Sequence, residues 1–166
     1  MTDRLRFSRL AVALVAAGAL ASLSACGPAD GANQAPLAER TINVAGDAPH
    51  VSRRVTDWLK KEARSEINAR ANAAAEALDK RILKIQIRDT RSRWGSCSED
   101  ARLSFSWRLM MAPENVLTYV VAHEVAHLVE LNHSDRFWRL VDQLCPGNEP
   151  AKYWLKRHGA SLHRFG

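Results

Sequence analysis

The sequence predicts an α+β fold with a small antiparallel sheet, a long N-terminal helix, a buried central helix and further helices at the C-terminus. A chain of 166 residues suits one domain with a modest core. Apolar residues recur at helical spacing over residues 50–79, and two short segments alternate apolar and polar side chains. A third stretch, residues 114–131, is apolar nearly all round, which is typical of a buried helix.

Residues 1–26 have the pattern of a targeting leader. Arginines precede an apolar run at residues 10–23 that is too short for a typical transmembrane helix. The run ends in Leu-Ser-Ala-Cys, which resembles the bacterial lipobox, whose cysteine takes the lipid. We therefore expect a membrane-anchored lipoprotein of the cell envelope, with the lipid on Cys26. The alternative is a mis-assigned start codon and a cytoplasmic protein.

Residues 27–41 are Gly, Pro, Ala and polar residues without a period, which indicates a flexible linker. The domain itself is expected to cover residues 42–166, with a brief strand within residues 40–46.

The long helix is expected from about His50 to Asp79, where apolar residues recur mostly at spacings of three and four. Basic side chains lie outside this apolar stripe. The net charge of +6 and this basic surface permit nucleic-acid binding, but a solvated helix face is the favoured interpretation.

The sheet is expected to begin with a half-buried strand at Leu83, Ile85 and Ile87. Residues 90–98 then form a second strand or a turn, and residues 103–107 form another strand.

The remaining residues predict three helices. The central one begins after Pro113, with Glu114 near its positive end, and runs to about Leu131. Residues 134–144 form a second helix and residues 149–158 a third, which Gly159 caps.

The central helix carries His123, Glu124 and His127 in an HExxH pattern. Residues four apart lie about 40° apart around a helix, so both imidazoles can reach one metal ion. Glu124 lies further round, where it reaches a metal-bound water better than the ion. Burying two histidines and a glutamate on one helix costs free energy unless they have partners, and a bound metal is the simplest explanation.

His133 is the candidate for the third ligand, and Glu130 is the nearest alternative. A continuous helix would carry His133 about 240° around the axis from His127. The helix must therefore stop near Leu131 or Asn132, because asparagine tolerates the left-handed conformation that ends helices. Ser134 is a good N-cap for the next helix.

The segments HEVAHLVELNHSDRFW, RSRWGSCS (residues 91–98) and FSWRLMMAP (residues 105–113) together resemble the YgjP-like metallopeptidases, relatives of the SprT-like zincins. The resemblance covers residues 42–166 and implies a minimal zincin fold. It implies that His123, His127 and His133 bind zinc and that Glu124 is the catalytic acid/base. Members of the family begin with additional β-strands, where this chain has its leader.

By this reading the protein hydrolyses peptide bonds of peptide or protein substrates. Three histidines leave one zinc position open to water, which the metal activates and Glu124 deprotonates. In zincins an edge strand holds extended substrate, and we expect residues 103–107 to be that edge. Candidates for stabilising the oxyanion, besides zinc, are Arg93, Tyr119 and Tyr153.

Two alternative functions stay open. One is a zinc-dependent hydrolase of nucleotides, which a basic pocket lined by Arg91 and Arg93 would favour. The other is a zinc-binding protein without activity. The sequence gives no indication of oligomeric state.

Neither remaining cysteine has CxxC spacing, so Cys97 and Cys145 indicate neither a zinc ribbon nor a redox pair. A disulfide between them is open from the residues alone, and the resemblance favours free thiols. His50, His158 and His163 lack metal spacing and are expected at the surface.

Overall fold

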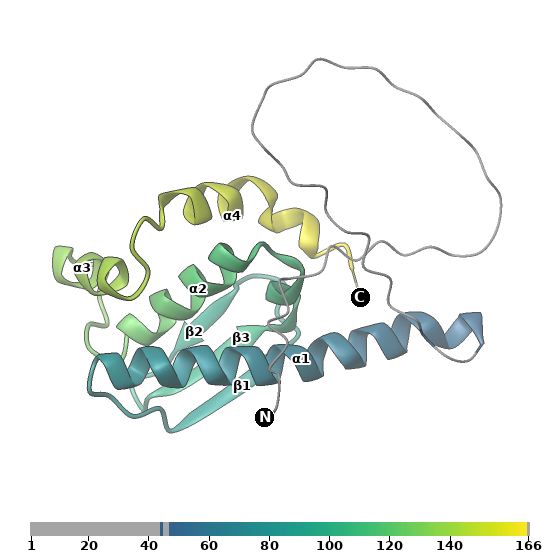
Figure 1. Ribbon diagram of the computed structural model, residues 1–166, viewed down its shortest axis with the longest axis horizontal. Coiled ribbons are helices and arrows are strands. Elements are labelled where there is room, and N and C mark those ends of the chain that lie inside the picture. Colours follow the sequence, from purple (N-terminus) through teal and green to yellow (C-terminus); the bar gives the residue numbers. More distant parts are fainter. Residues whose placement is uncertain (1–43, 45–46, 166) are drawn as a thin grey trace, which may run out of the picture.

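The computed structural model describes Val44 and residues 47–165, and it has the α+β architecture predicted from the sequence. Its elements, in chain order, are α1 (Ala48–Ala77), β1 (Lys84–Arg88), β2 (Gly95–Cys97), β3 (Arg102–Ser106), the 3-10 helix η1 (Trp107–Met111), α2 (Glu114–Ala126), α3 (Asp135–Leu144) and α4 (Glu149–Leu162). Helix α2 lies at the centre and packs against α1, β2, α3 and α4 (Figure 1).

Helix α1 is the long amphipathic helix expected from the apolar spacing. Its buried side chains are Leu59, Ala63, Ile67, Ala71 and Ala75. Spacings of four, repeated along the helix, keep these residues on one stripe, which faces α2 and the sheet. The predicted residues 50–79 therefore agree with the observed helix within two residues at each end.

The sheet is mixed rather than antiparallel. Strand β3 lies in the centre, parallel to β1 and antiparallel to β2. A tight turn containing Ala101 in the left-handed conformation (φ 57°) joins β2 to β3, so these two must be antiparallel neighbours. Residues 89–94 connect β1 to β2 and leave a gap between them in the sheet. Strand β3 fills this gap and runs parallel to β1. The expectation of a purely antiparallel sheet was wrong for this reason.

Residues 103–107 are therefore not an edge strand. Leu103 and Phe105 are buried, and both backbone edges of β3 are paired. Trp107 lies outside the strand, because it begins η1 and is buried there. Among the described strands, β1 and β2 form the outer edges of the sheet.

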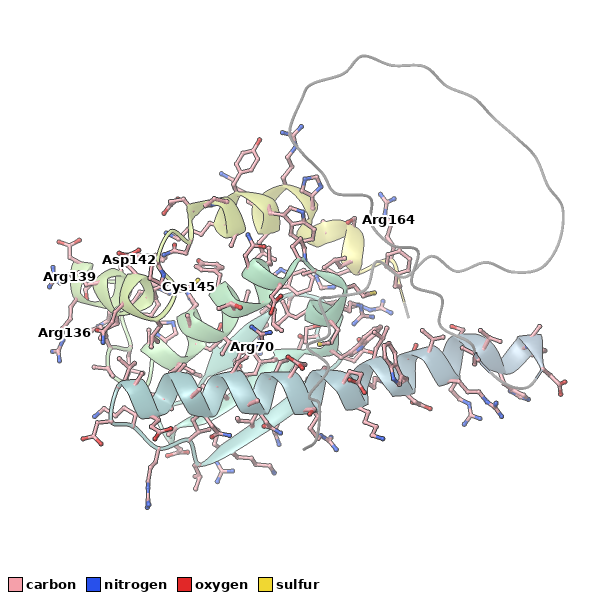
Figure 2. All side chains as sticks on the ribbon, viewed as in Figure 1. Arg70, Arg136, Arg139, Asp142, Cys145 and Arg164 are labelled. Carbon is pink, nitrogen blue, oxygen red and sulfur yellow. The ribbon has the colours of Figure 1, made fainter. Side chains whose placement is uncertain are left out.

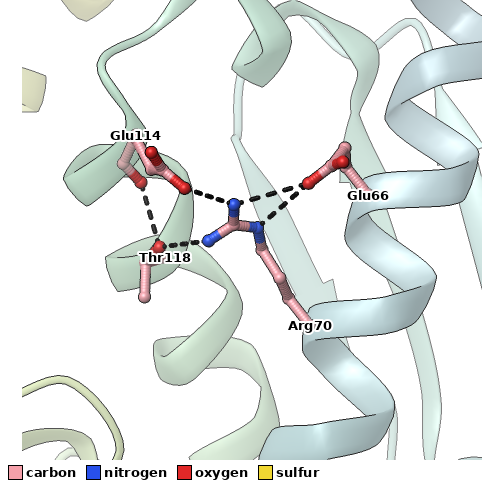
Figure 3. Close-up of polar contacts among 4 residues, drawn as sticks. All are labelled: Glu66, Arg70, Glu114 and Thr118. Carbon is pink, nitrogen blue, oxygen red and sulfur yellow. Dashed lines mark hydrogen bonds and ion pairs between the residues drawn. The ribbon is translucent and has the colours of Figure 1, made fainter. Parts of the chain in front are cut away.

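Arg70 ties α1 to the first turn of α2 (Figure 3). Its guanidinium donates to Glu114 at 2.5 Å and to the Thr118 hydroxyl at 2.9 Å, and Glu66 on α1 lies 3.4 Å away. These contacts hold the first turn of α2 against α1. Glu114 also sits in the first turn of α2, where a carboxylate is favoured by the helix dipole.

The C-terminal helices follow the prediction, with one correction. The third predicted helix was expected to end at His158, whereas α4 continues to Leu162 and holds Gly159 in its interior. A Cβ at Gly159 would lie 3.2 Å from the Trp94 ring. Gly159 therefore serves close packing against Trp94, and not helix termination.

The leader at residues 1–26, with Cys26, and the linker at residues 27–41 lie outside the described residues, as does nearly all of the strand expected within residues 40–46. In the described part of the chain, no helix is long and apolar enough to cross a membrane.

Candidate metal centre and catalytic pocket

The three histidines predicted as ligands converge. One ring nitrogen from each of His123, His127 and His133 lies within 4.8 Å of the others. The Nε2 atoms of His123 and His133 are 3.1 Å apart. Such a cluster has the donor type and spacing of a tri-histidine metal site. Glu130, the alternative third ligand, is not part of the cluster.

His133 reaches the pair because α2 ends early. The predicted end was near Leu131, but the last residue of α2 is Ala126 and His127 is its C-cap. The backbone then tightens, with Leu128 N–H donating to the Val125 carbonyl at 3.0 Å. Asn132 does not adopt the left-handed conformation, since the described non-glycine residues that do are Asp79 and Ala101.

Helix α3 begins where expected and packs under the imidazoles. The Ser134 hydroxyl accepts from Phe137 N–H at 3.3 Å and caps the helix. Phe137 is fully buried, and its ring centroid lies 4.4, 4.7 and 4.9 Å from those of His127, His133 and His123. Figure 2 shows Arg136 and Arg139 pointing outward from the same helix. Phe137 thus holds all three rings, a role that the sequence analysis missed.

The protonation of the cluster suits a metal. His127 Nδ1 lies 3.0 Å from the Glu130 carbonyl oxygen, so the tautomer with a proton on Nδ1 donates there and leaves Nε2 free. Burial lowers the pKa of His123 to about 4, and the nearby His127 and His133 act in the same direction. Burial also lowers the pKa of His127. Neutral imidazoles are the metal-binding form, so these residues fit a divalent ion such as zinc.

Glu124 is outside the cluster and is 7% exposed. Burial raises the pKa of its carboxyl to about 7, while the charge of Arg93 opposes the rise. A pKa near neutrality suits a group that takes a proton and gives it back. The separation from the metal cluster agrees with the position inferred from helix geometry.

Gly95 on β2 makes room for Glu124. A Cβ at this position would lie 2.5 Å from Glu124 Cγ and 2.6 Å from Oε1, which is closer than real atoms approach. Only glycine therefore lets the backbone of β2 lie against the carboxyl group. The glycine of the RWGS segment was a signal for such a close approach, although the sequence analysis did not use it.

Beside the metal cluster lies a pocket of about 340 Å³ that contains His123 and Glu124. The other residues that line it are Arg93, Trp94, Gly95, Tyr119, Val120 and Leu155. A pocket of about 670 Å³ lies at the end of α1, but neither Glu124 nor any histidine of the metal cluster lines it. The smaller pocket is therefore the candidate catalytic pocket.

Of the residues named as oxyanion candidates, the structure brings two to this pocket. Arg93 and Tyr119 line it, and the Tyr119 ring meets His123 edge-on at 5.9 Å. Tyr153 is 62% exposed and accepts from Arg157 at 2.6 Å, away from the pocket lining. Arg91 does not line the pocket either.

The other histidines stay outside the metal cluster. His50 and His158 are exposed, as expected. His163 is half-buried and stacks on Trp94 with ring centroids 4.5 Å apart. Cys97 and Cys145 are free thiols, and burial raises the pKa of both, that of Cys97 to about 11.

Comparison with known proteins gives one match. The family model described as YgjP-like, metallopeptidase domain, matches residues 29–158. No curated protein and no solved structure matches the chain.

Proposed function

Since the chain belongs to the YgjP-like metallopeptidase family, we propose that it hydrolyses peptide bonds with zinc held by His123, His127 and His133. The proposal rests on one observation: a cluster of possible metal ligands and a separate possible base lie at the same pocket. Three imidazoles meet within 4.8 Å, and a buried carboxyl group with a pKa near 7 stands beside them without joining the cluster. That is the arrangement of a catalytic rather than a structural metal site.

Zinc bound there would supply Lewis acidity, which activates a water molecule and polarises the scissile carbonyl. Glu124 takes the proton of the attacking water on a carboxylate oxygen and returns it to the leaving amine. Burial of Glu124 keeps the pKa of its carboxyl close to neutrality, so both transfers are accessible. Gly95 holds the backbone of β2 against this carboxyl and limits its movement.

We propose β2, in place of residues 103–107, as the strand that holds substrate. Its outer edge is unpaired within the described sheet, and Gly95 contacts the catalytic glutamate. An extended peptide paired with this edge would run directly past Glu124. Backbone pairing gives affinity with little demand on side chains.

Hydrolysis of nucleotides is the alternative that rests on a basic pocket. Of the two arginines that would form this basic pocket, only Arg93 lines the pocket of Glu124. A single guanidinium is a poor match to a polyphosphate, so peptide hydrolysis is the better supported function.

The test is a hydrolysis assay on unfolded and folded proteins and on a nucleotide panel, with zinc measured on the same sample. We expect one zinc per chain and cleavage of unfolded protein, abolished by a chelator and restored by zinc. Phosphate release from nucleotides without peptide cleavage would support the alternative. A fully zinc-loaded sample that cleaves neither substrate would indicate a binding protein.

For the leader we propose lipidation at Cys26 and attachment to the membrane of the cell envelope. The support is the lipobox-like sequence after an apolar run. Cys26→Ser should block processing and leave the leader attached. A wild-type protein that fractionates as soluble with its leader intact would contradict the lipoprotein and support a cytoplasmic location.

A further inference from the structure

Arg93 is the one basic side chain among the residues that line the catalytic pocket. It immediately precedes Trp94 and β2, and its charge opposes the rise that burial causes in the pKa of the Glu124 carboxyl. The rest of the lining, apart from His123 and Glu124, is the backbone of Gly95 and the largely apolar side chains of Trp94, Tyr119, Val120 and Leu155. The pocket therefore combines an apolar interior with one guanidinium.

The backbone at Arg93 is anchored on both sides. Its carbonyl accepts from the Thr90 hydroxyl at 2.8 Å, and the carbonyl of Trp94 accepts from Ser106 N–H at 2.8 Å. The Trp94 ring stacks on His163, with centroids 4.5 Å apart, and lies close to α4 at Gly159. Arg93 thus projects from a fixed position, which lowers the entropic cost of using it in recognition.

The guanidinium of Arg93 is also available to a ligand. Two other arginines have carboxylate partners: Arg70 pairs with Glu66 and Glu114, and Arg108 pairs with Asp89. Arg93 is exposed and forms no ion pair with a described residue. An exposed arginine that lines an apolar pocket and forms no ion pair is suited to bind a carboxylate with two parallel hydrogen bonds.

The role of Glu124 indicates which side of the cleaved bond the pocket faces. Because Glu124 returns its proton to the leaving amine, the pocket that it lines faces the fragment on the amine side of the cleaved bond. The apolar lining would take the body of that residue. A carboxylate on it would then meet Arg93.

We propose that Arg93 selects substrates that carry a carboxylate on the amine side of the scissile bond, close to that bond. This inference rests on the proposed peptidase function and adds its substrate class. Two sources supply the group: the free C-terminus of a short leaving fragment, or an Asp or Glu side chain. Arg93 acts in this account as a specificity-determining residue.

The test uses matched peptides on one scaffold that the zinc-loaded enzyme cleaves. One pair has a free or an amidated C-terminus on a short leaving fragment, and the other has Glu or Gln directly after the cleaved bond. Wild type should favour the carboxylate member of at least one pair by about 10-fold in kcat/KM, the scale of one partly exposed charge-assisted contact. The pair that responds identifies the source.

The matched variants are Arg93→Gln and Arg91→Gln. Arg91 is exposed, two residues away, and outside the pocket lining, so its loss should leave the preference intact. Arg93→Gln should bring both members of the pair to nearly equal rates. The readout is the ratio of the two rates, because loss of the charge that acts on Glu124 changes both rates together. Arg93→Glu should reverse the preference toward a Lys member. A preference that survives Arg93→Gln would overturn the proposal, as would an equal loss on charged and uncharged peptides.

A binding measurement separates this inference from the function on which it rests. Calorimetry on the zinc-loaded protein would compare the affinities of the same carboxylate and amide peptides for wild type and Arg93→Gln. If wild type cleaves no peptide, the peptidase proposal fails, and a carboxylate preference in binding that Arg93→Gln removes still supports Arg93. Equal affinities for both members in wild type overturn it.

Discussion

The two halves of the candidate site are assembled in different ways. The metal-binding half comes from one continuous stretch, residues 120–138, in which α2, a tight turn and α3 bring three histidines together. The substrate-facing half combines residues 93–97 with α4, far along the chain, around Glu124. Spacing along a helix determines the first half, whereas the second depends on how β2 and α4 pack on α2. The two halves should therefore fail separately when mutated.

The largest effect is expected for His133→Ala in the metal-binding half. Loss of one of three protein ligands removes a bond and the geometry of the site. The variant should purify with much less than one zinc per chain and without activity, as measured by metal analysis and peptide hydrolysis. Glu130→Ala is the control, because its backbone carbonyl still accepts from His127. If Glu130→Ala lost zinc and His133→Ala kept it, Glu130 and not His133 would be the third ligand.

Gly95→Ala should break the substrate-facing half alone. The new Cβ would overlap the Glu124 carboxyl group, which has to move away. A misplaced base costs on the order of 10²-fold in kcat, while zinc content should stay at the wild-type level. Gly147→Ala is the control: Gly147 has φ +68° and open surroundings, so it should lower stability but not activity. Equal activity losses in the two variants would contradict a specific role for Gly95.

Phe137→Leu tests whether ring packing supports the metal site. The fully buried ring contacts all three histidines, so its replacement should lower the free energy of unfolding by about 1–3 kcal/mol and weaken zinc binding about 10-fold. Val141 on the same helix is also fully buried but has no aromatic ring to pack on the imidazoles, so Val141→Ala is the control. It should lower stability without changing zinc affinity, and a similar affinity loss in both would refute the packing role.

The smallest effect is expected for Arg70→Gln, because Arg70 belongs to neither the metal cluster nor the pocket lining. Arg70 is partly exposed and Glu114 is about half exposed, so their ion pair is screened by solvent. Denaturant unfolding should show a loss of about 1 kcal/mol or less. Zinc content and kcat should not change. A change in either would mean that the α1–α2 contact in Figure 3 positions the site.

The same comparison explains what the sequence could predict. The HExxH spacing predicted that His123 and His127 lie close together, and Ser134 predicted the start of α3, because both depend on local helix geometry. The exact end of α2 was placed too late, since tightened backbone bonds rather than Asn132 end the helix.

Features set by distant packing escaped prediction. The position of β3 depends on how residues 89–94 cross the sheet, and alternation of side chains does not encode that crossing. The contact of Gly95 with Glu124 joins residues far apart in sequence, as does that of Gly159 with Trp94. Phe137 was predicted to lie in a helix, but the sequence did not show that its ring would contact the three imidazoles.

The most direct measurement of the central claim is made on Glu124→Gln, which keeps the shape of the side chain and removes the base. Zinc content, thermal stability and turnover should be determined on the same preparation. The account predicts zinc and melting close to wild type, with turnover lower by at least about 10²–10⁴-fold. Activity within a few-fold of wild type would contradict the role of Glu124 as base, and loss of zinc together with activity would make it a ligand or support of the metal.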